Sequence, residues 1–449
     1  MKRLPLTLLT LTFTLAAASA AFAQIAPHVV RTKLAGIDVL LYPTGVKNVV
    51  NLKGALPAGD VFSAGSNPAV ATLTGMLLEE GTTKQDKFAI AAKLDAVGAT
   101  LDFSVGNELL QISAKCLKKD VPLVISLIAE QLRMPALSAE EFEKAKKQYA
   151  GNLKRSLEST DNQAGEAAGL ALYPAGHPNR PTPHAEVLAA IERTTLAEVK
   201  AFHAAHYGPA HMTLTAVGDL DLPLIQAELG KAFAGWTGGT ALPKAMRATP
   251  GDMAKEQVVF MPEKTSVSVI VAQTSHLHYG EADYQALRLG TAILGSGFTG
   301  RLMGNVRDKE GLTYGIGASL ANDTFADGDF RISGTFAPNL LDKGIASTQR
   351  QLNLWYNDGV TEKEVTDRKT NLIGRFKVGL ATTDGMANQL LSTVHRGLPL
   401  SWLDTYPSEI AALTTAQVNG AIKKHLNPAD MVLIKAGTVP GAMPAVPKG

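Results

Sequence analysis

An internal repeat constrains the fold of this chain more than any other feature of its sequence. Residues 191–218 recur as residues 410–437 at a constant offset of 219 positions. The same offset places residues 97–101 (VGATL) on residues 316–320 (IGASL). Separated stretches that share one spacing indicate two homologous halves of about 210 residues each.

The repeat also predicts the division into domains. We expect a first domain at residues 24–236 and a second at residues 253–449. Between them lies a predicted linker at 237–252, where Gly, Pro and Thr cluster.

Each half begins with strand-like segments and continues with helical ones. Ser138, followed three residues later by Glu141, is expected to cap a helix. Strand pairs followed by helices are typical of an α+β fold, so we predict two sandwich domains, each a largely antiparallel sheet with helices on one face. The predicted strands are 38–42, 49–56, 257–261 and 267–273. The predicted helices are 68–80, 87–97, 121–134, 139–157, 284–294, 340–357 and 362–380.

The amino terminus has the pattern of a secretory signal peptide. Lys2 and Arg3 precede a short apolar stretch, and Ala21-Phe22-Ala23 is a cleavage signal before Gln24. The apolar stretch is shorter than the roughly 20 residues that a membrane helix needs, so a membrane anchor is the weaker alternative. We expect residues 1–23 to be removed and the mature protein to be exported, with no membrane attachment.

Composition excludes several function classes. A net charge of +2 gives no reason to expect a nucleic acid or an anionic membrane as a partner. The single cysteine, Cys116, forms no internal disulfide and no cysteine zinc site. Its surroundings alternate like a strand, which predicts a sheet residue in the core.

Two adjacent motifs in the second half carry a family resemblance. Residues 294–302 (LGSGFTGRL) and 306–315 (VRDKEGLTYG) resemble the second-half signature of pitrilysin/insulinase (M16) zinc peptidases, specifically the short, two-domain bacterial type. The two halves and the His177-Pro178 dipeptide fit that family. The resemblance implies two α+β domains of the M16/LuxS-like metallohydrolase fold. It also implies two chains that face each other around a peptide chamber, here in the periplasm.

The zinc site of that family is missing from this sequence. In the family an H-x-x-E-H helix in the first half supplies two histidines on one helical face and a glutamate as general base. The expected positions fall on Thr72, Gly75 and Met76, or on Ala71, Thr74 and Gly75 in a register shifted by one. Near the expected downstream glutamate stands Lys154, with Glu158 close by. We therefore expect no cofactor in this chain and zinc in a partner subunit.

An unconventional zinc site is an alternative. His203, His206 and His211 lie close together in the sequence, and His276 and His278 form a second group. Because His206 recurs as His425 in the repeat, a structural role at the corner between helix and strand is favoured.

The second half keeps a different pair of residues. By resemblance, Tyr314 would donate a hydrogen bond to the scissile carbonyl, and Arg307 would hold the substrate backbone. The repeat-equivalent positions in the first half are Phe88 and Asp95. The alternative is that Arg307 pairs with a neighbouring carboxylate, Asp308 or Glu310, while Tyr314 packs in a core.

The glycine-rich segment 295–300 needs its own interpretation. It lacks the Gly-Lys-Ser/Thr ending of a phosphate-binding loop, so we predict a tight turn that places Arg301 and Leu302.

Together these features predict a non-catalytic, substrate-contacting subunit of a periplasmic M16-type zinc metallopeptidase that acts on peptides. The chain is expected to be inactive alone and to support a metalloendopeptidase activity as a heterodimer with a zinc-bearing subunit. Two alternatives stay open: a non-enzymatic peptide-binding or scaffold dimer, and an independent metallopeptidase with unconventional ligands.

Overall fold

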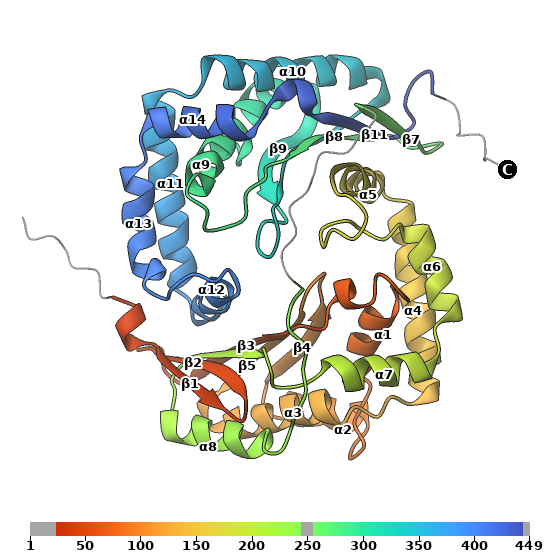
Figure 1. The fold of residues 1–449 in the computed structure, drawn as a ribbon, viewed down its shortest axis with the longest axis vertical. Coiled ribbons are helices and arrows are strands. Elements are labelled where there is room, and N and C mark those ends of the chain that lie inside the picture. Colours follow the sequence, from red (N-terminus) through yellow and green to blue (C-terminus); the bar gives the residue numbers. More distant parts are fainter. Residues whose placement is uncertain (1–23, 244–254, 443–449) are drawn as a thin grey trace, which may run out of the picture.

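The computed structural model describes residues 24–243 and 255–442. The first half of the chain forms the lower lobe in Figure 1 and the second half forms the upper lobe. The predicted signal peptide (1–23) and most of the predicted linker lie outside the described residues, so both stay predictions.

The first half is built on a sheet of six strands. Its order is β1-β2-β6-β3-β5-β4, in which β2 and β6 pair in parallel and all other neighbours pair antiparallel. Its strands are β1 (Val30–Leu34), β2 (Ile37–Pro43), β3 (Val49–Leu56), β4 (Thr100–Val105), β5 (Leu110–Leu117) and β6 (Thr213–Gly218).

The second half repeats this topology. Its order β7-β11-β8-β10-β9 matches β2-β6-β3-β5-β4 strand for strand, and β7 and β11 form the corresponding parallel pair. Its strands are β7 (Glu256–Phe260), β8 (Val267–Thr274), β9 (Thr313–Ala321), β10 (Asp329–Phe336) and β11 (Val432–Gly437). The predicted α+β fold with two homologous, largely antiparallel sheets is confirmed.

Helices cover the sheets and form the walls that join the two lobes (Figure 1). The helices of the first half are α1 (Val70–Met76), α2 (Lys87–Asp95), α3 (Val121–Arg133), α4 (Ala139–Leu157), α5 (Thr160–Leu172), α6 (His184–Arg193), α7 (Leu196–His206) and α8 (Leu222–Ala232). Those of the second half are α9 (Tyr284–Gly295), α10 (Leu341–Asp358), α11 (Glu362–Leu380), α12 (Thr383–His395), α13 (Trp402–Ala412) and α14 (Thr415–His425), with a π-helical segment, η5 (Met303–Lys309).

Local sequence signals account for several of these boundaries. Ser138 accepts a hydrogen bond from the backbone N–H of Glu141 at 3.3 Å, so α4 starts where the cap predicts. The predicted helix at 68–80 is instead α1 followed by a 3₁₀ turn, Leu77–Glu79. Cys116 is a buried residue of β5, and burial raises the pKa of its thiol to about 12, which keeps it unreactive.

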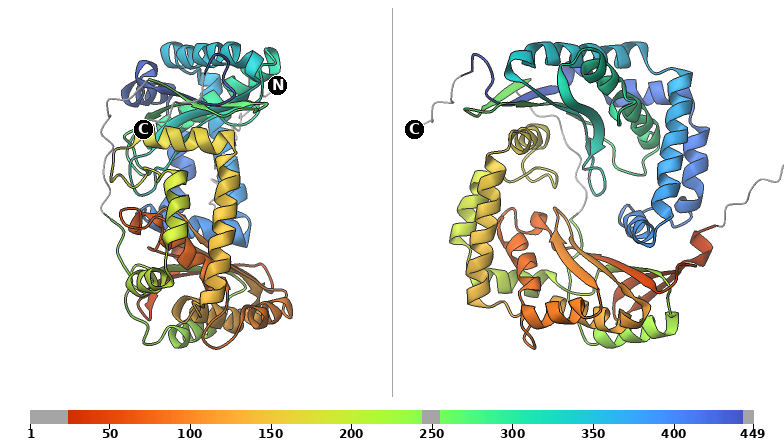
Figure 2. Two further views of the ribbon diagram at one scale, coloured as in Figure 1. Left: turned by 90° about the vertical axis from the view of Figure 1, so that its right-hand side faces the viewer. Right: turned by 180° about the vertical axis from the view of Figure 1, so that it is seen from behind.

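The two halves exchange one helix each. Helix α5 of the first half packs on the second sheet, where Ala164 and Ala168 join one hydrophobic cluster with Ile270 and Ile434. Helix α12 of the second half packs on β3 and β6 of the first sheet. Figure 2 shows the exchange from behind, with each helix against the opposite lobe. The sequence did not predict this, and each sheet therefore has its second face covered by the other half.

Polar contacts anchor the amino-terminal ends of both exchanged helices. On α12, Thr383 accepts a hydrogen bond from the side chain of Asn51 at 2.7 Å, and Asp384 forms a salt bridge with Lys53 at 2.8 Å. On α5, the hydroxyl of Thr160 accepts a hydrogen bond from Ser268 at 2.8 Å. The exchange therefore fixes the two halves against each other.

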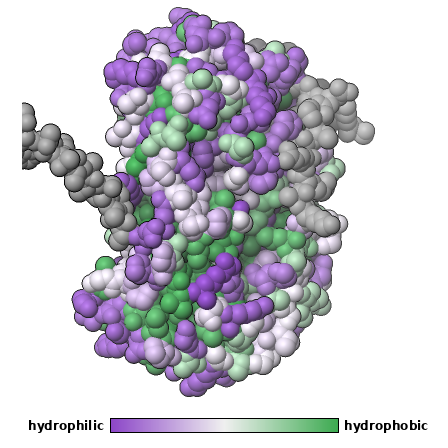
Figure 3. All heavy atoms as spheres, turned by 60° about the vertical axis from the view of Figure 1, so that its left-hand side comes forward, coloured by the Kyte–Doolittle hydropathy of each residue, from purple (hydrophilic) through white to green (hydrophobic). Residues whose placement is uncertain are grey.

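The lobes differ in surface character on one side. On the face drawn in Figure 3, hydrophobic residues gather in the lower part, whereas the upper part is mostly hydrophilic. Within the described residues, no helix combines the length and hydropathy needed to cross a bilayer.

Candidate functional site

Helix α1 carries the three positions at which the family has its zinc-binding residues, and each of these positions has a different contact in this chain. The hydroxyl of Thr72 donates to Asp60 Oδ1 at 3.0 Å. At Gly75, a side chain would collide with Val105 of β4. Met76 is partly buried against an apolar cluster. The helix therefore packs through these positions and does not present ligands there.

A buried polar cluster stands in this region. Burial raises the pKa of Asp60 to about 6, although the hydrogen bond from Thr72 opposes the shift. Burial, together with the nearby charge of Asp60, raises the pKa of Tyr149 to about 12. The cluster has one carboxylate that titrates near neutral pH and a phenol that stays neutral.

This cluster borders a cavity of about 790 Å³, which we call the first-half cavity. Asp60 and Tyr149 line it together with His177, His184 and Glu186. Within residues 24–243 and 255–442, no three His, Cys, Asp or Glu side chains are arranged to hold a metal ion.

The region around the expected downstream glutamate, Lys154 and Glu158, also lies away from the first-half cavity. Lys154 is exposed on α4. Glu158 forms a salt bridge with Lys264 of the second half at 2.7 Å. Neither residue lines the first-half cavity, so this region contributes no ligand to it.

The histidines considered for an unconventional site have separate partners. His203 Nε2 lies 2.8 Å from the carbonyl oxygen of Leu132, and His206 Nδ1 lies 3.0 Å from the hydroxyl of Thr240. Burial lowers the pKa of both imidazoles. His206 and its repeat mate His425 end α7 and α14, the corner positions that the repeat indicates.

The other candidate histidines do not complete a metal site. His211 is exposed and has a positive φ of 64°. His276 lies 3.2 Å from the hydroxyl of Thr274, and His278 lies 3.4 Å from Glu281.

The His177-Pro178 dipeptide lies at a junction between the halves. His177 is buried, stacks on Tyr173 at 4.7 Å between ring centroids, and lies 3.1 Å from Asp327 of the second half. Asn179 donates to the backbone carbonyls of Asn322 and Asp327, both at 2.9 Å. The resemblance pointed to this dipeptide without assigning it a role, and only the structure shows its contacts.

Arg307 and Tyr314 lie together at the surface of the second half. The guanidinium carbon of Arg307 is 5.5 Å from the ring centroid of Tyr314 and 5.2 Å from that of Phe298. Tyr314 is 90% exposed and Phe298 is 72% exposed. We call these three residues the Arg307–Tyr314 cluster. It presents a cation, a phenol and an aromatic ring to solvent.

The alternative for these residues has two parts, which the structure treats differently. The alternative that Tyr314 packs in a core is wrong. Arg307 does lie 3.7 Å from Asp308, but Glu310 pairs with Arg350 at 2.6 Å. At the repeat-equivalent positions, α2 carries an exposed Phe88 and Asp95, which offer no such pair.

A β-bulge explains why Tyr314 points outward. In the ladder of β9 and β10, Ile316 pairs with Gly334 and Thr313 pairs with Phe336, so Tyr314 and Gly315 together face one residue. The hydroxyl of Thr313 accepts from the N–H of Gly315 at 3.1 Å and stabilises the bulge. Bulges of this kind re-aim side chains and occur next to functional sites.

The glycine-rich segment brings α9 close to β9. A side chain at Gly295 would collide with the backbone of Ala318, and Gly297 has a positive φ of 68°. Arg301 is held by a bidentate salt bridge to Glu364 at 2.6 and 2.7 Å, and Leu302 is buried. These contacts match the predicted turn, and they position η5, which carries Arg307.

Known proteins resemble this chain along most of its length. The family model "Insulinase (Peptidase family M16)" matches residues 55–168, and "Peptidase M16 inactive domain" matches residues 193–372. The chain belongs to the M16 family.

Proteins similar to this chain include one named as a non-peptidase and others named as zinc proteases. The chain is 24% identical to "non-peptidase homolog YmxG" of Helicobacter pylori, over 83% of this chain and 85% of that protein. It is 26% identical to an "uncharacterized zinc protease" of Mycobacterium bovis, over 86% of this chain and 89% of that protein.

Solved structures agree with the M16 assignment. A peptidase M16 inactive domain from Pseudomonas fluorescens superposes with a TM-score of 0.84 at 27% identity, over 93% of this chain and all of that one. A protease from Helicobacter pylori has a TM-score of 0.79 at 18% identity, over 91% of this chain and 99% of that one, which shows the shared fold alone. With Thr72, Gly75 and Met76 at the zinc-binding positions, this M16 chain is a homologue of the non-catalytic type.

Proposed function

We propose that this chain is the substrate-contacting subunit of a periplasmic M16 peptidase and works with a zinc-bearing subunit. One observation carries the proposal: Tyr314 is exposed on a bulged strand beside Arg307 of η5, while α1 offers nothing that holds zinc. A chain with the M16 fold that keeps the substrate-binding residues but lacks the zinc ligands is suited to assist catalysis at the zinc site of another subunit.

The chemistry of the cluster fits a peptide in the act of cleavage. The exposed phenol of Tyr314 donates a hydrogen bond to the scissile carbonyl oxygen as negative charge develops on it. The guanidinium of Arg307 donates to neighbouring peptide carbonyls through its fixed donors. The residues of α1 in this chain do not fit a metal, so the partner subunit would hold the zinc, which would activate the attacking water.

The strand that carries Tyr314 favours an extended substrate. Among the described strands, β9 pairs only with β10 and is an edge of its sheet. Its free backbone groups can pair with a peptide that adds as a further strand. This mode requires a short or unfolded peptide, since a folded protein keeps its strands paired internally.

A reconstitution experiment tests the proposal. The purified chain is mixed with a zinc-bearing M16 protein of the same cell, and hydrolysis of a fluorogenic peptide is followed. We expect activity only in the mixture, and Tyr314→Phe should lower kcat about 10²–10³-fold because it removes one oxyanion donor.

A matched tyrosine serves as the control. Tyr356 on α10 has its ring 3.7 Å from the amine of Lys423, away from the cluster, so Tyr356→Phe should leave kcat unchanged. Equal cleavage with the parent chain, with Tyr314→Phe and with no added chain contradicts the proposal. So does stoichiometric zinc, measured by elemental analysis, in the chain purified alone together with chelator-sensitive peptidase activity.

A further inference from the structure

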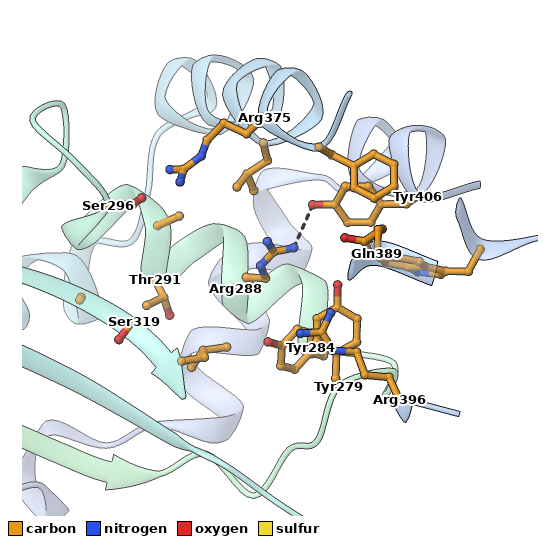
Figure 4. A pocket seen from close by; sticks show the side chains of 16 residues that line it. Tyr279, Tyr284, Arg288, Thr291, Ser296, Ser319, Arg375, Gln389, Arg396 and Tyr406 are labelled. Carbon is orange, nitrogen blue, oxygen red and sulfur yellow. Dashed lines mark hydrogen bonds between the residues drawn. The ribbon is translucent and has the colours of Figure 1, made fainter. Parts of the chain in front are cut away.

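The second half contains a cavity at the position that corresponds to the first-half cavity. It has a volume of about 370 Å³ and lies among α9, β9, α11, α12 and α13 (Figure 4). Three of its lining residues, Tyr279, Arg396 and Trp402, follow lining residues of the first-half cavity, Asp60, His177 and Pro183, at the repeat offset of 219 positions. We call it the second-half cavity.

The charges that line the second-half cavity are all positive. Arg288 of α9, Arg375 of α11 and Arg396 at the end of α12 line it, and no aspartate or glutamate does. Within residues 24–243 and 255–442, none of these three arginines forms a salt bridge. The second-half cavity therefore gathers cationic groups that no described carboxylate contacts.

The groups that do contact these arginines are neutral. Arg288 donates to the hydroxyl of Tyr406 at 2.9 Å, drawn as a dashed line in Figure 4. The guanidinium carbon of Arg396 lies 3.7 Å from the ring centroid of Tyr279. Burial raises the pKa of Tyr406, so this phenol does not supply a negative charge.

Two buried polar atoms in the wall have no hydrogen-bond partner among the described residues: Thr291 Oγ1 and Arg396 Nε. Thr291 is only 2% exposed. A buried donor without an acceptor destabilises the folded chain, and a buried charge without a partner destabilises it more. A ligand that brings negatively charged acceptor oxygens would satisfy these groups.

The carboxylate that contacts the lining residue Tyr284 belongs to Asp323, outside the cavity. Asp323 accepts a hydrogen bond from the hydroxyl of Tyr284 at 2.6 Å and does not line the second-half cavity. The remaining wall is largely apolar and aromatic, with Phe376 and Trp402 in contact at 5.8 Å between ring centroids.

We infer that the second-half cavity is a binding site for a small organic anion, whose negatively charged group is bound by the arginines that line the cavity and whose apolar body packs on the aromatic wall. Its volume is at the low end of small-molecule pockets, which fits a single amino-acid-sized ligand. Two sources share this chemistry: the free carboxyl terminus of a peptide and a free phosphoryl compound. The site is separate from the Arg307–Tyr314 cluster.

Direct titration tests the inference. The full-length purified chain is titrated by calorimetry with N-acetyl-phenylalanine, with its carboxamide, and with inorganic phosphate at constant ionic strength. We expect the carboxylate to bind at least about tenfold more tightly than the amide, since only the carboxylate is charged. Tighter binding of phosphate than of either phenylalanine derivative also supports the anion site and assigns the phosphoryl source.

Two substitutions test the contribution of single side chains to anion binding, at positions where no described contact is lost. Arg375 is exposed on α11, and Arg375→Gln should weaken binding about tenfold or more. Thr291→Val removes a hydroxyl that has no partner, so it should weaken binding while the melting temperature of the free chain stays the same or rises. Arg155→Gln, an exposed arginine on the equivalent helix α4, is the matched control.

Two results of these titrations would overturn the inference. Absence of binding by both anions up to about 10 mM, which corresponds to less than about 3 kcal/mol, overturns the inference. So does equal weakening by Arg155→Gln and Arg375→Gln, because that indicates diffuse attraction. These titrations need no partner subunit, so failure of the proposed peptidase role leaves their result unaffected.

Discussion

The two halves of this protein share one topology and differ in what lines the equivalent cavities. The first-half cavity carries two carboxylates, Asp60 and Glu186, with His177 and His184. The second-half cavity carries three arginines and no carboxylate. At the equivalent position, Thr72 donates to Asp60, whereas Thr291 has no partner among the described residues. A duplicated fold thus sets where a site lies, and the side chains set its chemistry.

The exchanged helices extend the comparison to packing. Helix α5 presents mainly small residues, such as Ala164 and Ala168, to the second sheet. Helix α12 presents larger ones, Met386 and Leu390, towards the first sheet. The two contacts are equivalent in the topology but bury different amounts of side chain.

The largest expected effect concerns α12. Leu390 is fully buried, so Leu390→Ala should lower the free energy of unfolding by about 2–5 kcal/mol through lost burial and a new cavity. Val378→Ala on α11, at a position that is 71% exposed, is the control and should change it little. Urea denaturation followed by circular dichroism measures both. A loss of less than about 1 kcal/mol for Leu390→Ala would mean that the exchange contributes little to stability.

The next largest expected effect is a pH dependence of stability caused by Asp60, which lines the first-half cavity. The second-half cavity has no carboxylate that could titrate in this way. Its pKa is raised to about 6 in the folded chain from 3.8, so the folded state binds the proton more tightly. The contribution of Asp60 to the free energy of unfolding is therefore greatest below about pH 4, where the carboxyl is protonated in both the folded and the unfolded state. This contribution is lost as the pH rises through about 6. We expect up to about 3 kcal/mol from this shift, less whatever solvent screening removes.

Asp60→Asn checks the sign. The asparagine variant should gain stability relative to the parent between about pH 4 and pH 7, measured by urea denaturation at each pH. A parent that is instead stabilised relative to the variant as the pH rises would contradict the assignment of burial as the dominant cause.

The smallest effect tests the packing of α1 against β4. Gly75→Ala should lower the free energy of unfolding by about 1–3 kcal/mol, because its methyl group meets Val105. Gly230 on α8 has open space around it, so Gly230→Ala should be neutral or stabilising by about 0.4–1 kcal/mol. Thermal unfolding of the two variants decides. Equal stability would show that α1 can shift and could accept a larger side chain.

The candidate site divides into a part that the sequence predicted and a part that it did not. The missing zinc-binding residues at Thr72, Gly75 and Met76 and the choice of Arg307 and Tyr314 both came from the resemblance of sequence motifs to the M16 family. The bulge that exposes Tyr314 depends on the register of β9 against β10, and a two-against-one pairing leaves no pattern in either strand alone.

The sequence by itself determined the duplication, the strand β3 at Val49–Leu56, and the helices α4 and α11 to the residue. Repeat spacing, apolar periodicity and capping are properties of neighbouring residues, which is why they can be read without a fold. One local signal went unused: Ser159-Thr160-Asp161 and Thr382-Thr383-Asp384 begin the exchanged helices with the same cap pattern.

Only the tertiary structure decided which sheet each exchanged helix covers and which side chains share the second-half cavity. Both sheets offer an apolar face, so the periodicity of α5 or α12 does not distinguish its own half from the other. Arg288 and Arg396 lie far apart in the chain, and they converge because α9 and α12 pack around one space. Such convergence depends on long-range packing, for which a single sequence carries no local signal.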